Sequence, residues 1–288
     1  MGKPNLFITG FPKAGTTSLY YYMDKHKEIY CNPFIKEPRF FSSDYLGRED
    51  RRFSRNIVRS EEKYLALFRY SGNQKYIVDG SVYYSYFQGI APRIKEFSPK
   101  AKIIMCIRNP VDRFRSHCMM ERRDTNRNDS FSDFFRNPEL KSRISLLKSG
   151  IYGPSIEEYY NTFGRKNVYV AVFDDLITDS TKYYSGICDF LGINYESAEN
   201  IKINESGIQK NRFVINIIRL LKGIIPGFIT RRIRFRTKVR LNSFFYKTPL
   251  IENDPIPEEL RNDLMEYYKE DIKRTGNLIG RDLSGWLL

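Results

Sequence analysis

The sequence predicts an α/β fold, in which short buried strands alternate with amphipathic helices. Short apolar runs rich in Ile, Val, Phe and Tyr recur along the chain, and stretches with helical periodicity separate them. The runs show little alternation of polar and apolar residues, which is typical of parallel strands buried on both faces. The predicted strands are Asn5–Thr9, Lys75–Asp79, Lys102–Ile107 and Val168–Phe173.

Between and after these strands, the spacing of apolar residues predicts a series of helices. The last of them carries the strongest signals, because acidic residues fill its first turn and basic residues its last turn, which complements the helix dipole. A proline at its first position is also typical of a helix start. The predicted helices are Thr17–His26, Glu61–Tyr70, Tyr86–Phe97, Pro110–Arg122, Pro154–Phe163, Asp179–Leu191 and Pro257–Thr275.

No repeat, low-complexity segment or Gly/Ser linker divides the 288 residues, and a hydrophobic content of 41 % is enough for a folded core. We therefore predict one domain over residues 1–288. It carries a basic insertion at about 202–250, where the stretch 202–247 holds twelve Lys and Arg residues and a single acid, Glu205.

The formal net charge of +14 favours an anionic partner, a class that includes nucleic acid, a membrane surface and an anionic substrate. In residues 212–240, apolar residues interleave the basic ones, which also suits an anionic membrane surface. The start of the chain shows no signal-peptide pattern, and charged residues and Pro226 interrupt the most apolar stretch, Phe213–Ile229. We therefore predict a cytoplasmic protein with peripheral membrane contact through 212–240.

The segment Leu6–His26 has the composition of a phosphate-binding loop between a strand and a helix. Gly10 and Gly15 keep the spacing of the Walker A motif, G-x-x-x-x-G-K-[ST], but Thr16 occupies the lysine position. Lys13 lies instead in the middle of the loop. From there it reaches the oxygen that bridges the two terminal groups of a 5′ substituent shorter than a triphosphate. The changed order argues against a nucleoside triphosphatase.

A second anion-binding pattern follows the predicted strand Lys102–Ile107. Arg108 stands where the strand ends, Pro110 begins a helix, and Ser116 lies less than two helical turns further on. Arg108 and Ser116 can then share one phosphate, the arginine through a forked, charge-assisted contact. Together with the hydroxyl and amide groups of Thr16–Ser18, this pattern predicts a 3′,5′-bisphosphorylated nucleotide as ligand.

With these two motifs, the sequence resembles the sulfotransferases that use 3′-phosphoadenosine-5′-phosphosulfate (PAPS). The stretch FPKAGTTSL is similar to their 5′-phosphosulfate loop, and RNPVDRFRS is similar to their 3′-phosphate motif. KEPRFFS resembles the segment after the first helix in the carbohydrate sulfotransferases, including the heparan sulfate branch. YGPSIEEYYNTFGRKNVYVAVFDDLITD and LIGRDLSGWL extend the resemblance over most of the chain, and 202–250 is the stretch without a match.

The resemblance implies a single P-loop-like three-layer domain with a central parallel sheet flanked by helices. It implies transfer of the sulfuryl group of PAPS to a hydroxyl or amine of a glycan, and the basic, apolar-interleaved stretch 212–240 adds a lipid-linked glycan as a second class of acceptor. Glu37 would be the general base, Lys36 would pair with it and with the migrating sulfuryl group, and Lys13 would act on the leaving oxygen. The implied nucleotide-binding residues are Lys13, Gly15, Thr16, Thr17 and Ser18 at the 5′ end, Arg108 and Ser116 at the 3′-phosphate, and Tyr152 nearby.

Two other interpretations stay open from the residues alone. A P-loop kinase for a small metabolite would need the G-K-[ST] order and Mg²⁺, and a nucleic-acid-binding protein rests on charge only, so we expect no nucleic-acid partner. We expect no metal site, because the four cysteines lack C-x-x-C spacing. Asp79 is expected to line the acceptor cleft or cap its turn, His26 to be exposed, and His117 to pack within its helix.

Overall fold

The computed structural model describes residues 2–46, 57–125, 129–137, 146–197 and 254–288, and the backbone of 208–209 and 246–247. At its centre is a five-stranded sheet in the order β2-β3-β1-β4-β5, in which every neighbouring pair is parallel. The strands are β1 (Leu6–Gly10), β2 (Ile29–Cys31), β3 (Tyr76–Asp79), β4 (Lys102–Ile107) and β5 (Val168–Val172). The predicted central parallel sheet is thus confirmed.

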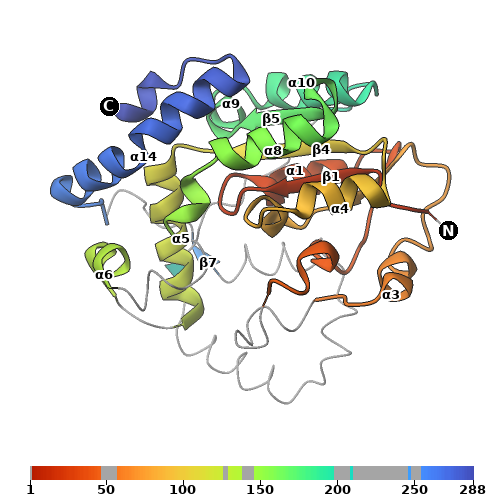
Figure 1. The fold of residues 1–288 in the computed structure, drawn as a ribbon, viewed down its shortest axis with the longest axis horizontal. Coiled ribbons are helices and arrows are strands. Elements are labelled where there is room, and N and C mark those ends of the chain that lie inside the picture. The colour runs from red at the N-terminus through yellow and green to blue at the C-terminus, as the bar shows by residue number, and fades with distance from the viewer. Residues whose placement is uncertain are drawn as a thin grey trace.

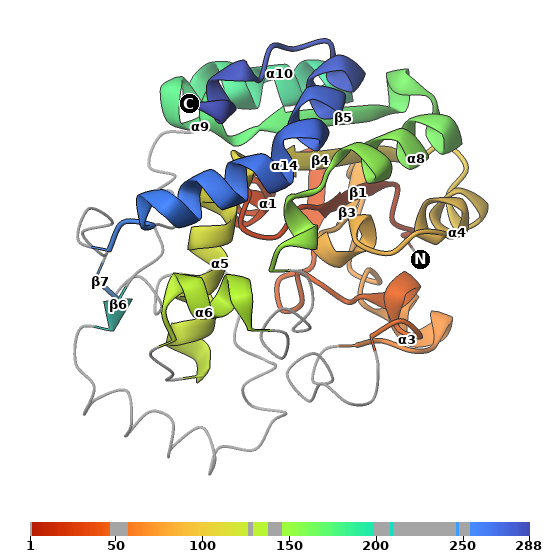
Figure 2. The same ribbon diagram turned by 60° about the vertical axis from the view of Figure 1, so that its left-hand side comes forward.

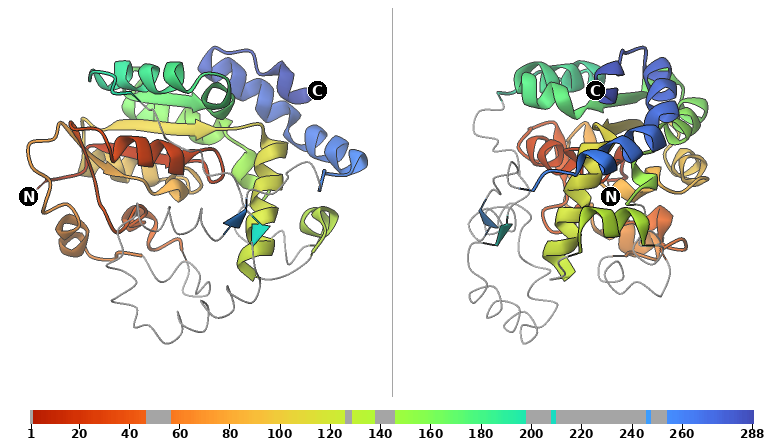
Figure 3. Two further views of the ribbon diagram at one scale, coloured as in Figure 1. Left: turned by 180° about the vertical axis from the view of Figure 1, so that it is seen from behind. Right: turned by 90° about the vertical axis from the view of Figure 1, so that its left-hand side faces the viewer.

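Helices cover both faces of the sheet and complete the three predicted layers. Figure 1 shows α4 and α8 in front of the sheet, and Figure 3 shows from behind that α1 and α10 cover the opposite face. The helices named below are α1 (Thr16–Met23), α3 (Glu61–Ala66), α4 (Ile90–Phe97), α5 (Pro110–Thr125), α6 (Phe131–Arg136), α8 (Gly153–Phe163), α9 (Phe173–Thr178), α10 (Ser180–Leu191) and α14 (Glu258–Ile279).

The strand order places the loop after β1 at a switch point of the sheet. β2 and β3, the next two strands along the chain, lie on one side of β1, and β4 and β5 lie on its other side. In open parallel sheets, ligands bind beyond the carboxyl ends of the strands at such a point. All residues of β1 and nearly all of β4 are buried, which gives this edge a rigid base.

The structure differs from the predicted elements where the sequence signal is short. β2 is not predicted, because its three residues show no strand pattern. The helix predicted at Tyr86–Phe97 begins only at Ile90, and a 3₁₀ helix, η2 (Val82–Ser85), precedes it and packs on β1. The helix predicted at Glu61–Tyr70 ends at Ala66. The six-residue helices α6 and α9 are also not predicted.

Most of the basic insertion at 202–250 lies outside the described residues. The described backbone forms two short strands there, β6 (Ile208–Gln209) and β7 (Tyr246–Lys247), which pair antiparallel. The membrane contact through 212–240 and the single domain over 1–288 therefore stay predictions. Within the part of the chain that is described, no helix is both long enough and apolar enough to cross a membrane.

The C-terminal helix α14 connects distant parts of the fold. It packs on α5 and on α8, and Figure 2 shows it running between them. It ends at Ile279, where Gly280 adopts the left-handed conformation (φ 66°) that commonly closes a helix. The chain then turns into a last 3₁₀ helix, η6 (Ser284–Leu287), in which Trp286 is buried.

Candidate functional site

The loop between β1 and α1 has the backbone of an anion-binding turn. Lys13 and Gly15 both have positive φ angles, 69° and 84°, so the chain folds tightly before α1 begins at Thr16. A side chain at Gly15 would collide with the ring of Phe173, because a Cβ there would lie 2.6 Å from its Cδ2. The N-cap residue of α1 is Gly15, which has no side chain that could bond to the first amide groups of the helix. Those amides can therefore donate to an anion at the positive end of the helix dipole.

Lys36 comes from the segment after β2 and touches this loop. Its Nζ donates to Thr16 Oγ1 over 3.1 Å and to Thr17 Oγ1 over 3.4 Å. The same Nζ lies 3.4 Å from Glu37 Oε1. The side chain of Lys36 is only 8 % exposed and that of Glu37 is 22 % exposed. The structure therefore brings the predicted base, its lysine neighbour and the predicted phosphosulfate loop together.

Arg39 completes a row of three charged side chains, and sequence reasoning missed it. Its Nη2 donates to Glu37 Oε2 over 3.0 Å, so the carboxylate lies between two cations. Burial alone would raise the pKa of Glu37, but the ammonium of Lys36 and the guanidinium of Arg39 hold it below its ordinary value. Burial lowers the pKa of Lys36, against the opposing effect of the Glu37 carboxylate. Glu37 is consequently ionised at neutral pH and able to accept a proton.

Asp79, at the end of β3, is a structural residue of this edge. It is fully buried and accepts hydrogen bonds from the hydroxyls of Tyr64 (2.7 Å), Tyr84 (2.9 Å) and Ser81 (2.6 Å). Burial raises the pKa of Asp79 to about 6, although these hydrogen bonds act in the opposite direction. The Ser81 hydroxyl in turn accepts the backbone N–H of Arg39 over 2.9 Å. Asp79 also accepts the backbone N–H of Ser81 over 3.0 Å, so it caps its turn, which is one of its two expected roles, and it fixes the segment that carries Glu37.

The second predicted phosphate site lies at the end of β4. Arg108 is half-buried, and its Cζ lies 4.7 Å from the centroid of the Phe173 ring. Burial lowers the pKa of Arg108. The following residue, Asn109, caps α5 by accepting the backbone N–H of Val111 over 2.9 Å. Ser116 lies in α5, where it is 9 % exposed. Phe173, a second residue that sequence reasoning missed, therefore touches both the loop at Gly15 and the side chain of Arg108.

Tyr152 contacts both the loop after β1 and the residue at the end of β4. Its ring is fully buried, with its centroid 4.6 Å from that of Phe11 in the loop after β1. Its hydroxyl donates to the backbone oxygen of Arg108 over 2.7 Å. The predicted contact of Tyr152 with the nucleotide stays a prediction, but its hydroxyl already has this structural partner.

Neither histidine faces the site as an exposed base. The expectation that His26 is exposed is wrong: it is 3 % exposed, because the segment after α10 covers it. Its Nδ1 accepts the backbone N–H of Glu28 over 3.2 Å, and its Nε2 donates to the oxygen of Asn194 over 2.8 Å. His117 is also 3 % exposed, and its Nδ1 lies 3.1 Å from Nη1 of the buried Arg113. Its expected packing role within the helix agrees with these contacts.

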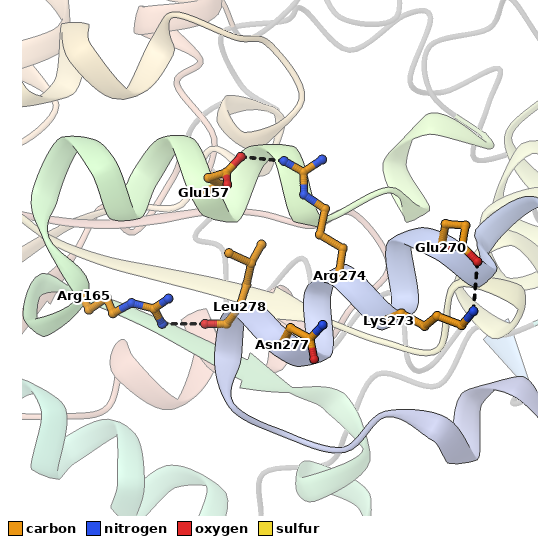
Figure 4. Close-up of a pocket in the computed structure, with 7 residues that line it drawn as sticks. All are labelled: Glu157, Arg165, Glu270, Lys273, Arg274, Asn277 and Leu278. Atoms are coloured by element: carbon orange, nitrogen blue, oxygen red, sulfur yellow. Dashed lines mark hydrogen bonds and ion pairs between the residues drawn. The ribbon is translucent and has the colours of Figure 1, made fainter.

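A separate surface pocket of about 520 Å³ lies between α8 and α14. Figure 4 shows two ion pairs among its side chains, Arg274 with Glu157 (2.5 Å) and Lys273 with Glu270 (3.0 Å), while Arg165 donates to the backbone oxygen of Leu278. None of the predicted site residues lines it. Across the described ranges, no three His, Cys, Asp or Glu side chains are grouped so that they could hold a metal ion. The edge formed by β1, β4 and the segment 36–39 is therefore the candidate site.

Comparisons of this chain with protein families and with single proteins both lead to sulfotransferases. The model of the sulfotransferase family matches residues 4–197. The bifunctional heparan sulfate N-deacetylase/N-sulfotransferase 1 of Xenopus laevis is 27 % identical over 203 residues, which are 66 % of this chain and 22 % of that protein. The membrane-associated sulfotransferase kil1 of Dictyostelium discoideum is 32 % identical over 110 residues, 38 % of this chain and 21 % of that protein. The chain thus spans about a fifth of the length of these two relatives.

Solved structures share the fold. The crystal structure of a sulfotransferase from Alicyclobacillus acidocaldarius matches with a TM-score of 0.75 and 26 % identity, over 99 % of both chains. Mouse sulfotransferase SULT7A1, solved in complex with PAP, matches with a TM-score of 0.54 and 17 % identity, over 96 % of this chain and 87 % of that one. The predicted three-layer fold therefore agrees with that of solved sulfotransferases.

Proposed function

The chain belongs to the sulfotransferase family, and from this premise we propose that it transfers the sulfuryl group of PAPS to a hydroxyl or amine of a carbohydrate. The names of its relatives support a glycan acceptor, since several are heparan sulfate N-sulfotransferases. The PAP complex of the mouse sulfotransferase supports the nucleotide, since PAP (3′-phosphoadenosine 5′-phosphate) is what PAPS becomes after transfer.

The observation that carries the proposal is the placement of the two phosphate motifs on adjacent strands. The loop with Lys13 and Gly15 follows β1, Arg108 follows β4, and Gly10 pairs with Met105 in the register of these strands. Phe173 contacts both motifs. One ligand with two separated phosphate-type groups can span them. Lys13, Gly15 and the start of α1 would then hold the 5′-phosphosulfate, and Arg108 and Ser116 the 3′-phosphate.

Sulfuryl transfer resembles phosphoryl transfer, in which positioning and charge stabilisation supply most of the catalysis. The acceptor oxygen or nitrogen attacks sulfur in line as the bond from sulfur to the 5′-phosphate oxygen breaks. Glu37 takes the proton of the acceptor, and Lys13 stabilises the negative charge that grows on the departing phosphate oxygen. Lys36, bonded to both Thr16 and Glu37, would lie beside the sulfuryl group as it moves.

A direct test is transfer of radiolabelled sulfate from PAPS to a panel of glycans by the purified protein. Labelled glycan should form with the natural sequence and should be lost in Lys13→Ala, while Lys25→Ala, which removes an exposed lysine beyond α1, should behave like the natural protein. Unchanged transfer by Lys13→Ala would reject the proposed role of the loop. Metal-dependent consumption of ATP in place of sulfate transfer would instead favour the small-molecule kinase.

We also propose, from the sequence alone, that residues 212–240 bring the enzyme to an anionic membrane surface and so to a lipid-linked glycan, on the cytoplasmic side. Flotation with vesicles of anionic and of neutral lipid, with the full chain and with a chain lacking 212–240, tests this. Binding that needs both the segment and the anionic lipid is expected. Equal flotation of the two chains would contradict the proposal.

A further inference from the structure

The buried Trp286, close to the C-terminus, holds two neighbours of Arg108. Its Nε1 donates to Asp174 Oδ2 over 2.6 Å, and its backbone oxygen accepts Asn109 Nδ2 over 3.4 Å. Asn109 directly follows Arg108 in the sequence. Asp174 directly follows Phe173, the ring against which the guanidinium of Arg108 lies. Trp286 thus contacts Asn109, the chain neighbour of Arg108, and Asp174, the chain neighbour of Phe173.

The C-terminal segment 281–288 is itself firmly attached to α9. Arg281 makes two hydrogen bonds to the carboxylate of Asp175, one of them between Nη2 and Oδ1 at 2.6 Å. Trp286 is 5 % exposed and Leu283 is 6 % exposed, so both side chains are part of the core. Figure 2 shows this end of the chain next to α9. The segment therefore fixes the start of α9, where Phe173 lies.

Phe173 also lies against the loop after β1. A Cβ at Gly15 would lie 2.6 Å from Cδ2 of its ring and 3.5 Å from Leu176 Cδ2, so the backbone at Gly15 packs closely on α9. The ring thus contacts both the loop after β1 and the guanidinium of Arg108. A small movement of α9 would shift the ring away from that guanidinium.

We propose that Trp286 is a positioning residue for the 3′-phosphate end of the nucleotide site, acting through Asp174 and Asn109 on Arg108. The inference rests on the proposed function, because it presumes that Arg108 binds the 3′-phosphate. An arginine side chain has much rotamer freedom to lose, and stacking on a fixed ring removes part of that freedom before the ligand arrives. The indole N–H holds Asp174 and thereby the adjacent Phe173 ring. The backbone oxygen of Trp286 holds Asn109 and thereby the backbone next to Arg108. Ring and backbone together set the direction of the Arg108 guanidinium.

The test compares two ligands that differ in one group, PAP and adenosine 5′-phosphate, which lacks the 3′-phosphate. Trp286→Phe keeps most of the apolar packing and removes the N–H donor, and Asp174→Ala removes its acceptor. In calorimetric titrations, each variant should bind PAP about fivefold more weakly, while its affinity for adenosine 5′-phosphate stays within about twofold. Combining both substitutions should weaken PAP binding no further than either alone.

Arg165→Gln is the matched control, since it also removes one hydrogen bond between distant segments, from Arg165 Nη1 to the oxygen of Leu278, and this bond involves neither α9 nor Asn109 (Figure 4). It should bind both ligands like the natural protein. Trp286 is the single tryptophan of the chain, so its emission reports whether the indole stays buried in Asp174→Ala. If Trp286→Phe does not fold, Asp174→Ala decides alone.

The outcomes separate this inference from the proposed function. A natural protein that binds PAP no better than adenosine 5′-phosphate overturns the proposed function, and this inference with it. A natural protein that prefers PAP, together with folded variants that keep the full preference, overturns the role of Trp286 alone. Equal weakening of both ligands also overturns it, because the role would then be a general structural one.

Discussion

The ammonium of Lys36 donates a hydrogen bond to the hydroxyl of Thr16 over 3.1 Å. Thr16 is the first residue of α1 and Lys36 lies in the loop after β2, so the contact joins two segments that meet only in the folded chain. Glu37 is held against the same ammonium. The predicted base is therefore tied through one lysine to the loop that would hold the phosphosulfate.

Replacing Lys36 by Met should reduce the rate of sulfate transfer by at least tenfold, since the buried cation is lost while the length of the side chain is kept (a charge acting on the transition state is commonly worth about 2–4 kcal/mol). Steady-state transfer from radiolabelled PAPS measures this. Lys25→Met, at an exposed position, is the control. Turnover equal to that of the natural protein would show that Lys36 acts only in folding.

Replacing Glu37 by Gln should stop the chemistry and leave nucleotide binding intact. A glutamine has the same shape but cannot take the proton of the acceptor, so kcat should fall about 10²- to 10⁴-fold. PAP affinity, measured by calorimetry, should stay within about twofold, since the carboxylate is not among the predicted nucleotide ligands. A normal rate of transfer would reject Glu37 as the base.

Replacing Arg39 by Gln should move the acid limb of the pH profile of kcat/KM to higher pH. The guanidinium is one of two cations that hold the pKa of Glu37 below its ordinary value, so its removal lets that pKa rise. The base must be ionised to work, so more of it is inactive at a given low pH. The exposed Arg93, paired with Asp44, provides the control substitution Arg93→Gln. If the acid limb of Arg39→Gln lies at the same pH as that of the natural protein, the ionisation of Glu37 does not determine this limb.

The buried Asp79 should make the protein more stable at mildly acidic pH. Its folded-state pKa of about 6 lies above its ordinary value of 3.8, so its contribution to stability is complete below about pH 4 and is lost as the pH rises through 6. Between pH 7.5 and pH 5, the free energy of unfolding should gain about 1 kcal/mol from this group. Urea unfolding of Asp79→Asn should lack that gain, while Asp44→Asn should keep it.

Local patterns in the sequence were sufficient for much of the fold. The strand Lys102–Ile107 is predicted with its observed bounds, because a continuous apolar run between a turn and Asn109-Pro110 leaves little choice. The phosphate loop is predicted on similar grounds, since all the residues of its motif lie within Gly10–Ser18. The edge strand β2 could not be found, because three residues carry no period.

Contacts between distant segments could not be read in this way. Lys36 and Thr16 are twenty residues apart, and Trp286 and Asp174 are more than a hundred apart. Arg39 stands two residues from Glu37, and its backbone has a positive φ of 56° that directs the chain in a way that no periodicity indicates. The two predicted phosphate motifs were visible in the sequence, whereas the residues that hold them in place required the structure.

The most direct test of the account is calorimetric titration of PAP into the natural protein and into Arg108→Ala. The natural protein should bind PAP more tightly than adenosine 5′-phosphate. Arg108→Ala should bind PAP at least about tenfold more weakly, as expected for a lost arginine–phosphate contact, and should bind adenosine 5′-phosphate as the natural protein does. No preference for PAP in the natural protein, or an unchanged preference in Arg108→Ala, would contradict the proposal that this edge of the sheet binds PAPS.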